Sequence, residues 1–488
     1  MLSTLLADLA RSNEPFAHTG VEDVGVSGVT PDSRAVRNGF LFAALPGSVV
    51  DGAKFIPGAL KAGASAILCT PESLVPDVGG IAVIRSTDPR RILALMAARF
   101  YGRGPENIVA VTGTNGKTSV ASFTRQIWDH MDIAAASLGT VGLETAGWRK
   151  SVKHTTPEPV TLHRLLTSVS DKNISHLAIE ASSHGLEQRR MDGIRFKAAG
   201  FTNISRDHLD YHKDFEDYFA QKLRLFDTLL PGDGIAVVNA DAPEGIKVIN
   251  IANERGIEVI SVGEHGSTLR LISSTPQGFG QKLKIMADGI EHDVLLPLAG
   301  TFQASNALVA AGLVMAVGFE AAQVLPHLAK LKGAKGRLEL VGTSAKSVPL
   351  FVDYAHTPDA LATALQALRP FAQGKLAVVF GCGGDRDRGK RPQMGEVAVT
   401  NADLVYVTDD NPRSEDASAI RAEILEGAQG AIEIGDRSAA IGAALAELGE
   451  GDLLLIAGKG HETGQTIGDK VLPYSDHEAV NSLLEAGA

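Results

Sequence analysis

A glycine-rich loop that carries a lysine and a threonine is the strongest chemical signal in the sequence. Gly113–Thr118 reads Gly-Thr-Asn-Gly-Lys-Thr and follows the apolar run Ile108–Val111. In such a loop, glycines let backbone N–H groups turn toward phosphate oxygens, the lysine neutralises phosphate charge, and the hydroxyl of Thr118 is available to Mg²⁺. The residues predicted to contact a nucleotide are Gly113, Thr114, Asn115, Gly116, Lys117, Thr118 and Ser119. The sequence therefore predicts an ATP-consuming enzyme.

A helix is expected directly after this loop, because Val120, Phe123 and Ile127 recur at helical spacing. Strand, loop and helix then occur in the order that points a helix N-terminus at a bound anion. One position departs from the general phosphate-loop pattern, which has a glycine five residues before Gly116 where this sequence has Val111. The order of the three elements favours a phosphate loop over a glycine-rich turn with a coincidental lysine.

A carboxylate is expected beside the loop. The apolar run His176–Ile179 predicts a second strand, and Glu180 follows it directly. The end of a neighbouring strand is where a nucleotide-bound Mg²⁺ finds an oxygen ligand. A solvated glutamate is the plainer alternative, and the nearby phosphate loop favours the metal role.

The elements that must position these residues belong to more than one domain. The chain has 488 residues, whereas single hydrophobic cores stop growing at ~250 to 300 residues. Glycine and proline are dense at residues 101–105, and a second glycine-rich break falls at residues 333–336. We therefore expect three domains, comprising residues 1–104, 105–332 and 333–488.

The pattern of apolar runs predicts α/β folds. In the first domain, Phe40–Ala44 and Ala66–Cys69 are strand-like, and Pro89–Phe100 is helical. The central domain is expected to close on the alanine-rich helix that follows Gly300. The third domain alternates helix-length stretches with four strand-like runs: Leu350–Val352, Leu376–Phe380, Leu404–Val407 and Leu453–Ile456. That alternation is typical of a parallel, doubly wound sheet.

Composition narrows the classes of partner. Lys and Arg total 46 against 57 Asp and Glu, and the resulting net charge of −11 disfavours a general nucleic-acid or anionic-membrane surface. Cys69 and Cys382 are too few for a disulfide framework, so we expect two buried thiols and a reducing compartment. The first residues lack a basic segment, Asp8 interrupts their apolar stretch, and no run approaches the ~18 apolar residues of a membrane span. A cytoplasmic protein is expected.

Several motifs resemble those of the Mur ligases. They are Thr-Gly-Thr-Asn-Gly-Lys-Thr at 112–118, Glu180 leading into Ala-Ser-Ser-His-Gly, Asn-Ile-Ser-Arg-Asp-His-Leu-Asp-Tyr-His at 203–212, Tyr-Phe-Ala-Gln-Lys at 218–222, Asp-Tyr-Ala-His-Thr-Pro at 353–358, and Gly-Lys-Gly-His-Glu at 458–462. The match spans all three expected domains. Asp410-Asn-Pro-Arg413 is similar to the motif with which the diaminopimelate-adding members select their amino acid.

The resemblance implies a UDP-binding N-terminal domain, a central P-loop ATPase domain with a mainly parallel sheet, and a C-terminal Rossmann-like domain for the incoming amino acid. It implies ligation of meso-2,6-diaminopimelate to UDP-N-acetylmuramoyl-L-alanyl-D-glutamate, a step of bacterial peptidoglycan precursor synthesis. ATP would phosphorylate the D-glutamate side chain, and the amine would attack the acyl phosphate. Mg²⁺ and cationic side chains are needed because several negative charges meet. We expect a monomer.

The resemblance also assigns the residues around the metal. In these ligases the lysine at the place of Lys222 carries a carbamate, which turns a cation into a carboxylate-like Mg²⁺ ligand. The modification requires a neutral and therefore desolvated amine; Leu223 and Phe226 give the surrounding helix an apolar face. The expected metal group is Thr118, Glu180, His208 and Lys222, and the expected catalytic group is Lys117, Glu180, His208 and Lys222.

Two further sets follow from the same matches. For the UDP precursor they are Ser33, Thr155, Thr156, Ser182, Gln188 and Arg190, with the stretches Asp32–Arg34 and Gly47–Gly52 near the uridine. Ser48, Val49 and Val50 replace more polar residues seen in some relatives. For the adenosine of ATP they are Asn306 and Arg337. Gln303 stands where relatives commonly have asparagine, so Asn306 is the preferred adenine contact of the two.

The amino-acid set lies in the third domain and comprises Arg386, Asp410, Asn411, Pro412, Arg413, Gly458 and Glu462. Arg386 and Arg413 follow predicted strands, at the edge where doubly wound sheets bind ligands. A guanidinium grips a carboxylate through two parallel bonds, and diaminopimelate has a second carboxylate that lysine lacks. Arg413 is therefore expected to select diaminopimelate, while Gly458 and Glu462 receive its distal amino group.

Other interpretations remain open. The same ligation with L-lysine is the nearest alternative. A nucleotide-dependent switch would need only the phosphate loop. An NAD(P)-dependent oxidoreductase is suggested by Gly381–Gly384, although Arg386 breaks the full glycine spacing. A zinc or di-metal hydrolase is suggested by His208 between Asp207 and Asp210, without a matching second cluster.

Overall fold

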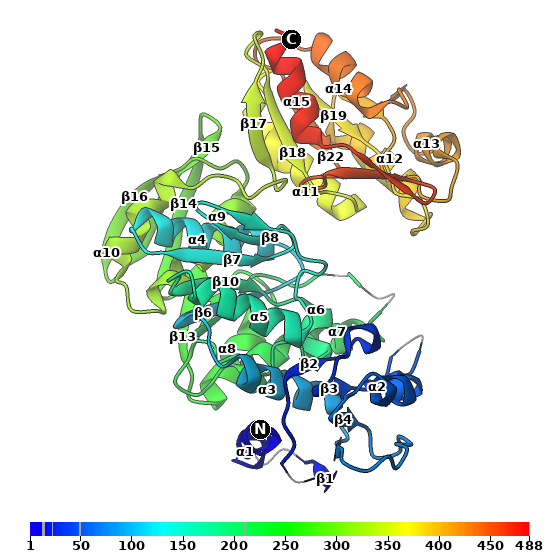
Figure 1. The fold of residues 1–488 in the computed structure, drawn as a ribbon. Helices are drawn as coiled ribbons and strands as arrows, with labels where there is room; N and C mark the ends of the chain where they lie inside the picture. The colour runs from blue at the N-terminus through cyan, green and yellow to red at the C-terminus, as the bar shows by residue number, and fades with distance from the viewer. Residues whose placement is uncertain (12–14, 22, 48–49, 206, 209–210, 488) are drawn as a thin grey trace. The chain divides into compact units, whose positions relative to one another are not determined.

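The structure is a computed structural model (Figure 1) that describes residues 1–11, 15–21, 23–47, 50–205, 207–208 and 211–487. The chain forms two compact units. The first contains residues 1–117, 124–261 and 312–318, and the second contains residues 118–123, 262–311 and 319–488. Along the described part of the chain, no helix is both long and apolar enough to cross a membrane.

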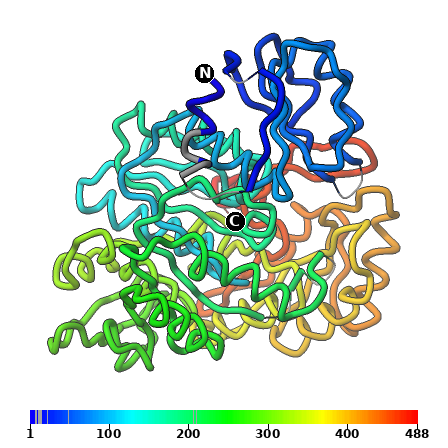
Figure 2. Tube along the Cα trace, turned by 90° about the horizontal axis from the view of Figure 1, so that it is seen from below, coloured from blue at the N-terminus to red at the C-terminus, as the bar shows by residue number. Residues whose placement is uncertain are grey.

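The N-terminal lobe, blue in Figure 2, is a five-stranded sheet of order β1-β5-β4-β3-β2 with its helices. Its elements are α1 Leu2–Arg11, β1 Ala17–Gly20, β2 Gly28–Thr30, β3 Phe40–Ala43, α2 Ile56–Lys61, β4 Ala66–Cys69, β5 Ala82–Arg85 and α3 Pro89–Tyr101. Strands β2 to β5 are parallel and β1 is antiparallel. The predicted strand 66–69 and the helix beginning at Pro89 are confirmed, whereas the strand from Phe40 ends one residue earlier than predicted.

The rest of the first unit is built on a mainly parallel sheet whose strands follow the order β13-β12-β11-β6-β10-β7-β8-β9. The strands are β6 Asn107–Thr112, β7 Ala135–Gly139, β8 Gly142–Thr145, β9 Arg149–Lys150, β10 His176–Glu180, β11 Ala198–Phe201, β12 Ile235–Asn239 and β13 Glu258–Gly263. The helices are α4 Lys117–His130, of which residues 118–123 belong to the second unit, α5 Pro159–Ser170, α6 Ser183–Glu187, α7 Phe215–Arg224 and α8 Gly245–Glu254. Helix α7 continues into one π turn, Leu225–Leu229.

Strand β6 lies between β10 and β11 and runs parallel to both. The carboxyl ends of parallel strands meet at one edge of a sheet. The segments after Thr112, Glu180 and Phe201 therefore converge. The Thr202 hydroxyl, for example, donates to the carbonyl of Thr112, 90 residues earlier in the sequence. This edge positions the candidate active site.

The second unit contains an antiparallel meander and two helices before its main sheet. The meander is β14 Leu269–Gln277, β15 Gly280–Ala287 and β16 Ile290–Leu296. The helices are α9 Thr301–Met315 and α10 Ala321–Val324. Helix α9 is the predicted alanine-rich helix after Gly300, and that prediction is confirmed.

The main sheet of the second unit has the strand order β17-β18-β22-β19-β20-β21. Its strands are β17 Glu339–Thr343, β18 Pro349–Asp353, β19 Leu376–Phe380, β20 Leu404–Val407, β21 Ile432–Glu433 and β22 Leu453–Ala457, and its helices are α11 Pro358–Leu368, α12 Lys390–Asn401, α13 Ala417–Leu425, α14 Arg437–Ala446 and α15 Asp476–Glu485. A hairpin, β23 Gly464–Ile467 with β24 Lys470–Pro473, precedes α15. Only β17 is antiparallel to its neighbour in the main sheet.

Both faces of this sheet are covered by helices, as the continuous apolar strands predicted. Leu376 and Val378 of β19 join a core with α11, α12 and α13 on one face. Ala377 and Val379 alternate with them and join a second core with α14 and α15. The predicted doubly wound fold is confirmed.

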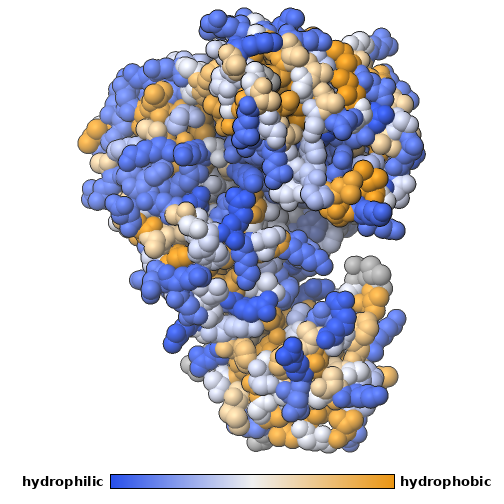
Figure 3. All heavy atoms as spheres, turned by 45° about the horizontal axis from the view of Figure 1, so that its top comes forward, coloured by the Kyte–Doolittle hydropathy of each residue, from blue (hydrophilic) through white to orange (hydrophobic). Residues whose placement is uncertain are grey.

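Apolar side chains fill these cores. On the face drawn in Figure 3, hydrophobic residues occur in small groups among hydrophilic ones. Cys69 and Cys382 are both buried free thiols, as expected. Burial raises the pKa of Cys382 to about 12, so this thiol is held in its unreactive protonated form.

Candidate active site

The phosphate loop, Gly113–Thr118, connects β6 to α4 as predicted. Gly113 has a φ of 152° and Gly116, the residue before the helix, has a φ of 87°. A Cβ on Gly113 would lie 1.9 Å from Oγ1 of Thr202, so only glycine fits at this close approach. Thr118 and Ser119 are buried in the first turn of α4, where the helix dipole favours an anion.

The loop is tied to the segment that follows β11. The Thr114 N–H donates to the carbonyl of Asn203 at 2.9 Å, and the Asn115 N–H donates to Oδ1 of Asn203 at 3.0 Å. Thr202 Oγ1 donates to the Asn115 carbonyl at 2.6 Å. The start of the predicted 203–212 motif therefore supports the phosphate loop. Arg206, Leu209 and Asp210 of that motif lie outside the described residues.

Two lysines converge on one backbone oxygen of the loop. Lys117 Nζ donates to the carbonyls of Gly113 and Thr114 at 2.8 Å each, and Lys222 Nζ donates to the Gly113 carbonyl, also at 2.8 Å. Lys222 comes from α7 and is 1% exposed. Burial, with a smaller contribution from the charge of Lys117, lowers the pKa of Lys222 well below its usual range. The amine of Lys222 is therefore desolvated, as carbamylation requires.

The aromatic ring of Tyr218 forms one wall beside Lys222. Lys222 Nζ lies 4.4 Å from the ring centroid, and the Tyr218 hydroxyl is 3.0 Å from Thr114 Oγ1. Burial raises the pKa of Tyr218, so its hydroxyl stays protonated. Tyr218 therefore links helix α7 to the loop by a hydrogen bond and by cation–π attraction.

Glu180 ends β10 and is buried at the same edge of the sheet. Its Oε1 accepts the Thr140 N–H at 2.8 Å, and its Oε2 accepts the Thr140 hydroxyl at 3.2 Å. These bonds orient the carboxylate. Thr140 was not identified from the sequence, because its role appears only when the loop after β7 is brought beside β10.

His208 lies beside Tyr218, with the two ring centroids 6.1 Å apart. Its φ is 54°, and its Nε2 is 3.6 Å from Oδ2 of Asp207. The ring of His184 contacts it edge-on at 5.0 Å and lies 4.0 Å from the ring of Tyr211. His184 was also missed as a site residue, although it belongs to the Ala-Ser-Ser-His-Gly motif.

With an unmodified Lys222, the side chains around Glu180 provide only part of the oxygen ligands that Mg²⁺ needs. Glu180 supplies carboxylate oxygens, which Mg²⁺ prefers, whereas the ammonium of Lys222 has no lone pair. Among the described residues, no three His, Cys, Asp or Glu side chains cluster closely enough to hold a metal ion. A carbamate on Lys222 would add the missing oxygen donors, so the residues fit Mg²⁺ with a modified lysine.

The candidates for the precursor meet beside Glu180. Thr140 Oγ1 is 3.0 Å from Thr155 Oγ1, and Thr156 Oγ1 donates to the Glu180 carbonyl at 2.8 Å. Thr156 Oγ1 is also 3.0 Å from Ser182 Oγ. Residues from three segments of the sequence therefore form one row of hydroxyl groups.

Arg190 completes this row. Its Nη1 donates to the Thr156 carbonyl at 2.7 Å and its Nη2 donates to Gln188 Oε1 at 2.7 Å. Burial lowers the pKa of Arg190, yet the guanidinium remains charged because its usual value is far above neutral. Ser33 begins a short 3₁₀ helix of the N-terminal lobe, Ser33–Ala35, which Asp32 caps. Of the uridine stretch Gly47–Gly52, Ser48 and Val49 lie outside the described residues.

The amino-acid candidates form a second group, in the second unit. Asp410 and Asn411 are buried after β20, and Asn411 Nδ2 donates to Glu462 Oε2 at 2.9 Å. Gly458 has a φ of 114°, and a Cβ there would lie 2.8 Å from Asp410 Oδ2. Burial raises the pKa of the Asp410 carboxyl against the opposing charges of Arg437 and Lys459. The two ends of the predicted set, near 411 and 462, are therefore in direct contact.

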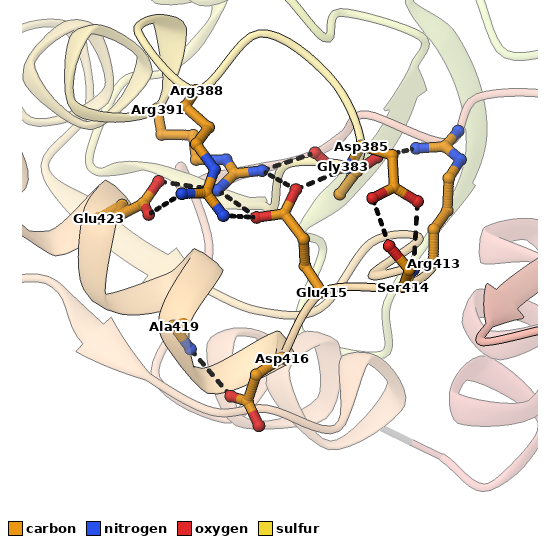
Figure 4. A network of polar contacts seen from close by, with 11 residues as sticks. Gly383, Asp385, Arg388, Arg391, Arg413, Ser414, Glu415, Asp416, Ala419 and Glu423 are labelled. Atoms are coloured by element: carbon orange, nitrogen blue, oxygen red, sulfur yellow. Dashed lines mark hydrogen bonds and ion pairs between the residues drawn. The ribbon is translucent and has the colours of Figure 1, made fainter.

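Arg413 adopts a left-handed conformation with a φ of 53°. Figure 4 shows its guanidinium reaching the loop after β19, where Nη1 donates to the Gly384 carbonyl at 2.6 Å. Asp385 in that loop accepts the Ser414 hydroxyl at 2.5 Å, and the Glu415 N–H donates to the Pro412 carbonyl at 3.0 Å. Arg386 lies exposed on the same loop. The structure thus brings Arg386 and Arg413 to neighbouring loops.

Arg391 is a charged residue in this region that the sequence did not single out. It is fully buried and pairs with Glu415 at 2.8 Å and Glu423 at 2.7 Å (Figure 4). The Arg391 guanidinium lowers the pKa of Glu415 to about 2. These pairs tie α12 to the segment that follows Arg413.

Asn306 and Gln303 lie one turn apart on α9 and bond to each other, with Asn306 Nδ2 donating to Gln303 Oε1 at 3.2 Å. Both side chains are buried. The hydrogen bond therefore fixes the position of Asn306, the preferred adenine contact, relative to Gln303. The guanidinium of Arg337 lies 4.8 Å from the ring centroid of Tyr354. Stacking on the ring limits where this cation points.

Three family models match the chain in sequence order. The Mur ligase family catalytic domain matches residues 25–101, the Mur ligase middle domain matches residues 111–314, and the Mur ligase glutamate ligase domain matches residues 336–460. All candidate residues except Glu462 lie within these three ranges.

Curated relatives match nearly the whole length. A protein of Bradyrhizobium diazoefficiens named UDP-N-acetylmuramoyl-L-alanyl-D-glutamate–2,6-diaminopimelate ligase is 54% identical over 97% of this chain and 97% of its own. A protein of Caulobacter vibrioides with the same name is 53% identical over 97% of each chain. These matches include the segments of both candidate groups.

Solved structures agree with the fold. A structure of a UDP-N-acetylmuramoyl-L-alanyl-D-glutamate–2,6-diaminopimelate ligase superposes with a TM-score of 0.71 at 32% identity, covering 94% of this chain and 95% of that chain. The MurF ligase from Thermotoga maritima in complex with ADP has a TM-score of 0.61 at 19% identity, covering 96% and 99%. The second likeness concerns the fold alone.

Proposed function

The chain belongs to the Mur ligase family, and we propose that it joins meso-2,6-diaminopimelate to UDP-N-acetylmuramoyl-L-alanyl-D-glutamate at the expense of ATP. The choice of amino acid rests on the hydrogen bond between Asn411 and Glu462, which Thr466 connects to the backbone of Arg413. That arrangement offers a guanidinium for a carboxylate and a carboxylate for an ammonium. A free amino acid end carries both charges, and diaminopimelate has two such ends.

The reaction needs an activated carboxylate. A carboxylate oxygen of the D-glutamate side chain attacks the γ-phosphorus of ATP, and the bond to ADP breaks. The neutral amine of diaminopimelate then attacks the acyl carbon, forming a tetrahedral intermediate that expels phosphate and loses a proton to give the amide. Both steps gather negative charge, which positioned cations stabilise.

The phosphate loop is the proposed site of the ATP phosphates. Lys117 now donates to two loop carbonyls, and a phosphate would offer its ammonium a charged acceptor instead. Mg²⁺, when bound, would neutralise phosphate charge. The proposed metal residues are Thr118, Glu180, His208 and carbamylated Lys222, and the proposed adenosine contacts are Asn306 and Arg337.

Lys222 is the proposed site of carbamylation. Its neutral amine attacks CO₂, a C–N bond forms, and the nitrogen releases a proton, so that a cation becomes an anion. The lowered pKa of Lys222 supports the first step because more of the amine is unprotonated at neutral pH. Lys117, which bonds the same carbonyl, would then stabilise the carbamate charge.

The hydroxyl row and Arg190 are the proposed contacts of the UDP precursor. Short hydroxyls and a guanidinium suit phosphate and carboxylate oxygens. The members are Thr155, Thr156, Ser182, Gln188 and Arg190, with Ser33 proposed for the uridine end. The proposed amino-acid contacts are Arg386, Asp410, Asn411, Pro412, Arg413, Gly458 and Glu462.

Domain limits at residues 104 and 332 are proposed as well, and the gaps between the three matched family models support them. We further propose that the enzyme acts as a monomer in the cytoplasm, where ATP is available. Two buried free cysteines are in keeping with a reducing compartment.

One product assay tests the function. The enzyme is mixed with ATP, Mg²⁺ and the UDP-dipeptide, together with equal concentrations of diaminopimelate and L-lysine, and the products are resolved by mass. The diaminopimelate tripeptide should dominate, and phosphate release should require both the UDP-dipeptide and the amino acid. A dominant lysine product would establish the alternative ligase. ATP hydrolysis that needs neither substrate would establish a nucleotide-dependent switch.

A further inference from the structure

Lys459 is a fully buried cation at the centre of the amino-acid group. It follows β22 and lies between Gly458 and Gly460, and its side chain is 0% exposed. Its Nζ donates to Asn411 Oδ1 at 3.1 Å and to Glu462 Oε2 at 3.3 Å, and lies 3.8 Å from Asp410 Oδ1. Burying an ammonium is costly unless it is paired and hydrogen-bonded. Here three oxygen partners from two segments meet that need.

Lys459 and Asn411 hold Glu462 from one side. Glu462 Oε2 accepts bonds from both Lys459 and Asn411 Nδ2. The Glu462 side chain is nevertheless 33% exposed. A carboxylate anchored by one oxygen and partly exposed is placed to accept the ammonium of a ligand.

The same lysine is connected to the backbone of Arg413. Asn411 Oδ1 accepts from Lys459 and also from the Thr466 N–H at 2.9 Å. The Thr466 carbonyl accepts the Arg413 N–H at 3.0 Å, and the Arg413 carbonyl accepts the Gly468 N–H at 2.7 Å. A continuous set of hydrogen bonds therefore runs from Lys459 through the β23 strand to the left-handed turn that carries the Arg413 guanidinium.

We propose that Lys459 is a positioning residue for the amino-acid substrate, because it holds the Glu462 carboxylate and the Asn411–Arg413 turn in a fixed mutual arrangement. The inference rests on the proposed function and deepens it. Lys459 need not touch the substrate. It lets the ammonium and the carboxylate at one end of diaminopimelate be bound at the same time.

Charge gives the proposal a second consequence. Asp410, Lys459, Glu462 and Arg413 form one charged group. Removing the Lys459 ammonium makes the net charge of this group more negative by one unit. Diaminopimelate carries two ammonium and two carboxylate groups at neutral pH, whereas lysine has a net positive charge. Loss of Lys459 should therefore weaken the binding of diaminopimelate more than the binding of lysine.

The test uses the full-length enzyme and three variants. Lys459→Met removes the ammonium and keeps an unbranched side chain, and Lys459→Gln keeps a hydrogen-bonding end without charge. Leu448→Ala is the matched control, because Leu448 is buried in the core beside α14 and takes no part in the hydrogen bonds of Lys459. Melting temperature, kcat and the KM of each of the three substrates are measured, and diaminopimelate and lysine are then placed in competition.

We expect Lys459→Met to raise the KM for diaminopimelate about 100-fold while the KM values for ATP and the UDP-dipeptide stay within about twofold. Lys459→Gln should show an intermediate rise, and both variants should shift the product ratio toward lysine. Leu448→Ala should lower the melting temperature without a selective change in KM. If Lys459→Met does not fold, the test rests on Lys459→Gln: its KM for diaminopimelate relative to the KM values of the other two substrates, and its product ratio.

An unchanged KM for diaminopimelate in a folded Lys459 variant would overturn the proposal. So would a parallel rise of all three KM values, because that is the expected result of a purely structural role. Failure of the wild-type enzyme to use diaminopimelate would instead refute the proposed function, and the wild-type assay alone decides that question.

Discussion

The ammonium of Lys222 lies 2.8 Å from the carbonyl oxygen of Gly113, which joins helix α7 to the phosphate loop across 109 residues of sequence. Lys117 donates to the same oxygen. A charged Lys222 would be repelled by Lys117 at this shared oxygen, and desolvation strengthens that repulsion, so the lowered pKa of Lys222 favours its neutral amine. Carbamylation would remove the repulsion by converting one cation into an anion.

Lys222→Ala should lower kcat at least about 100-fold, because a principal anionic metal ligand is lost. Added formate or acetate should restore part of the activity by supplying a carboxylate in the vacated space. Steady-state rates with and without these anions measure the effect. Lys197→Ala, at an exposed lysine before β11, serves as the control and should behave as wild type. Full activity of Lys222→Ala without added anions would refute the carbamate.

Glu180→Gln should raise the Mg²⁺ concentration needed for half-maximal activity by about 10- to 100-fold. The amide keeps the shape of the side chain but removes the charge, and its NH₂ group conflicts with the two donors of Thr140. Activity is measured across a Mg²⁺ titration. The exposed Glu106→Gln provides a matched control. An identical Mg²⁺ dependence in the two variants would remove Glu180 from the metal site.

Arg413→Ala should raise the KM for diaminopimelate about 100-fold and narrow the preference over lysine, because the second carboxylate loses its guanidinium. Competition between the two amino acids, read as a product ratio, measures the preference. Arg369→Ala removes a surface pair with Asp403 and hydrogen bonds to the carbonyls of Ala372 and Gly374. None of these contacts involves the amino-acid group, so both values should stay unchanged. A variant that keeps the full preference for diaminopimelate would exclude Arg413 as the selecting residue.

His163 should make the first unit sensitive to acid. It is buried on α5, and burial lowers the pKa of its imidazole from 6.5 to about 4. The folded state therefore favours the neutral ring, whereas the unfolded chain binds a proton below pH 6.5. Its contribution is fully present above pH 6.5 and is lost as the pH falls toward about 4, which costs about 3 kcal/mol in total.

His163→Leu should lose this dependence. The difference in melting temperature between wild type and variant should move in favour of the variant as the pH is lowered from 7 to about 4.5. His292→Leu, at a partly exposed histidine of β16, controls for the general effect of acid. A pH-independent difference for His163→Leu would show that His163 does not titrate in this range.

The site residues differ in how far the sequence could predict them. The strand, loop and helix around Gly113 follow from local spacing. Strand β6 begins one residue before the predicted run, and helix α4 begins at Lys117, inside the loop after which it was expected. Thr140, His184 and Lys459 carry no spacing signal of their own. Their importance comes from neighbours that are distant in sequence, such as Thr140 beside Glu180.

By itself, the sequence determined the alternation of apolar runs and helices, the phosphate loop, and the motifs that identify the family. These are local patterns, and local geometry is sufficient to produce them. Only the tertiary structure decided that Lys222 is buried against Gly113 and that Lys459 joins Asn411 to Glu462. Burial and pairing depend on which strands lie side by side, and parallel strand order brings together residues that no spacing rule connects.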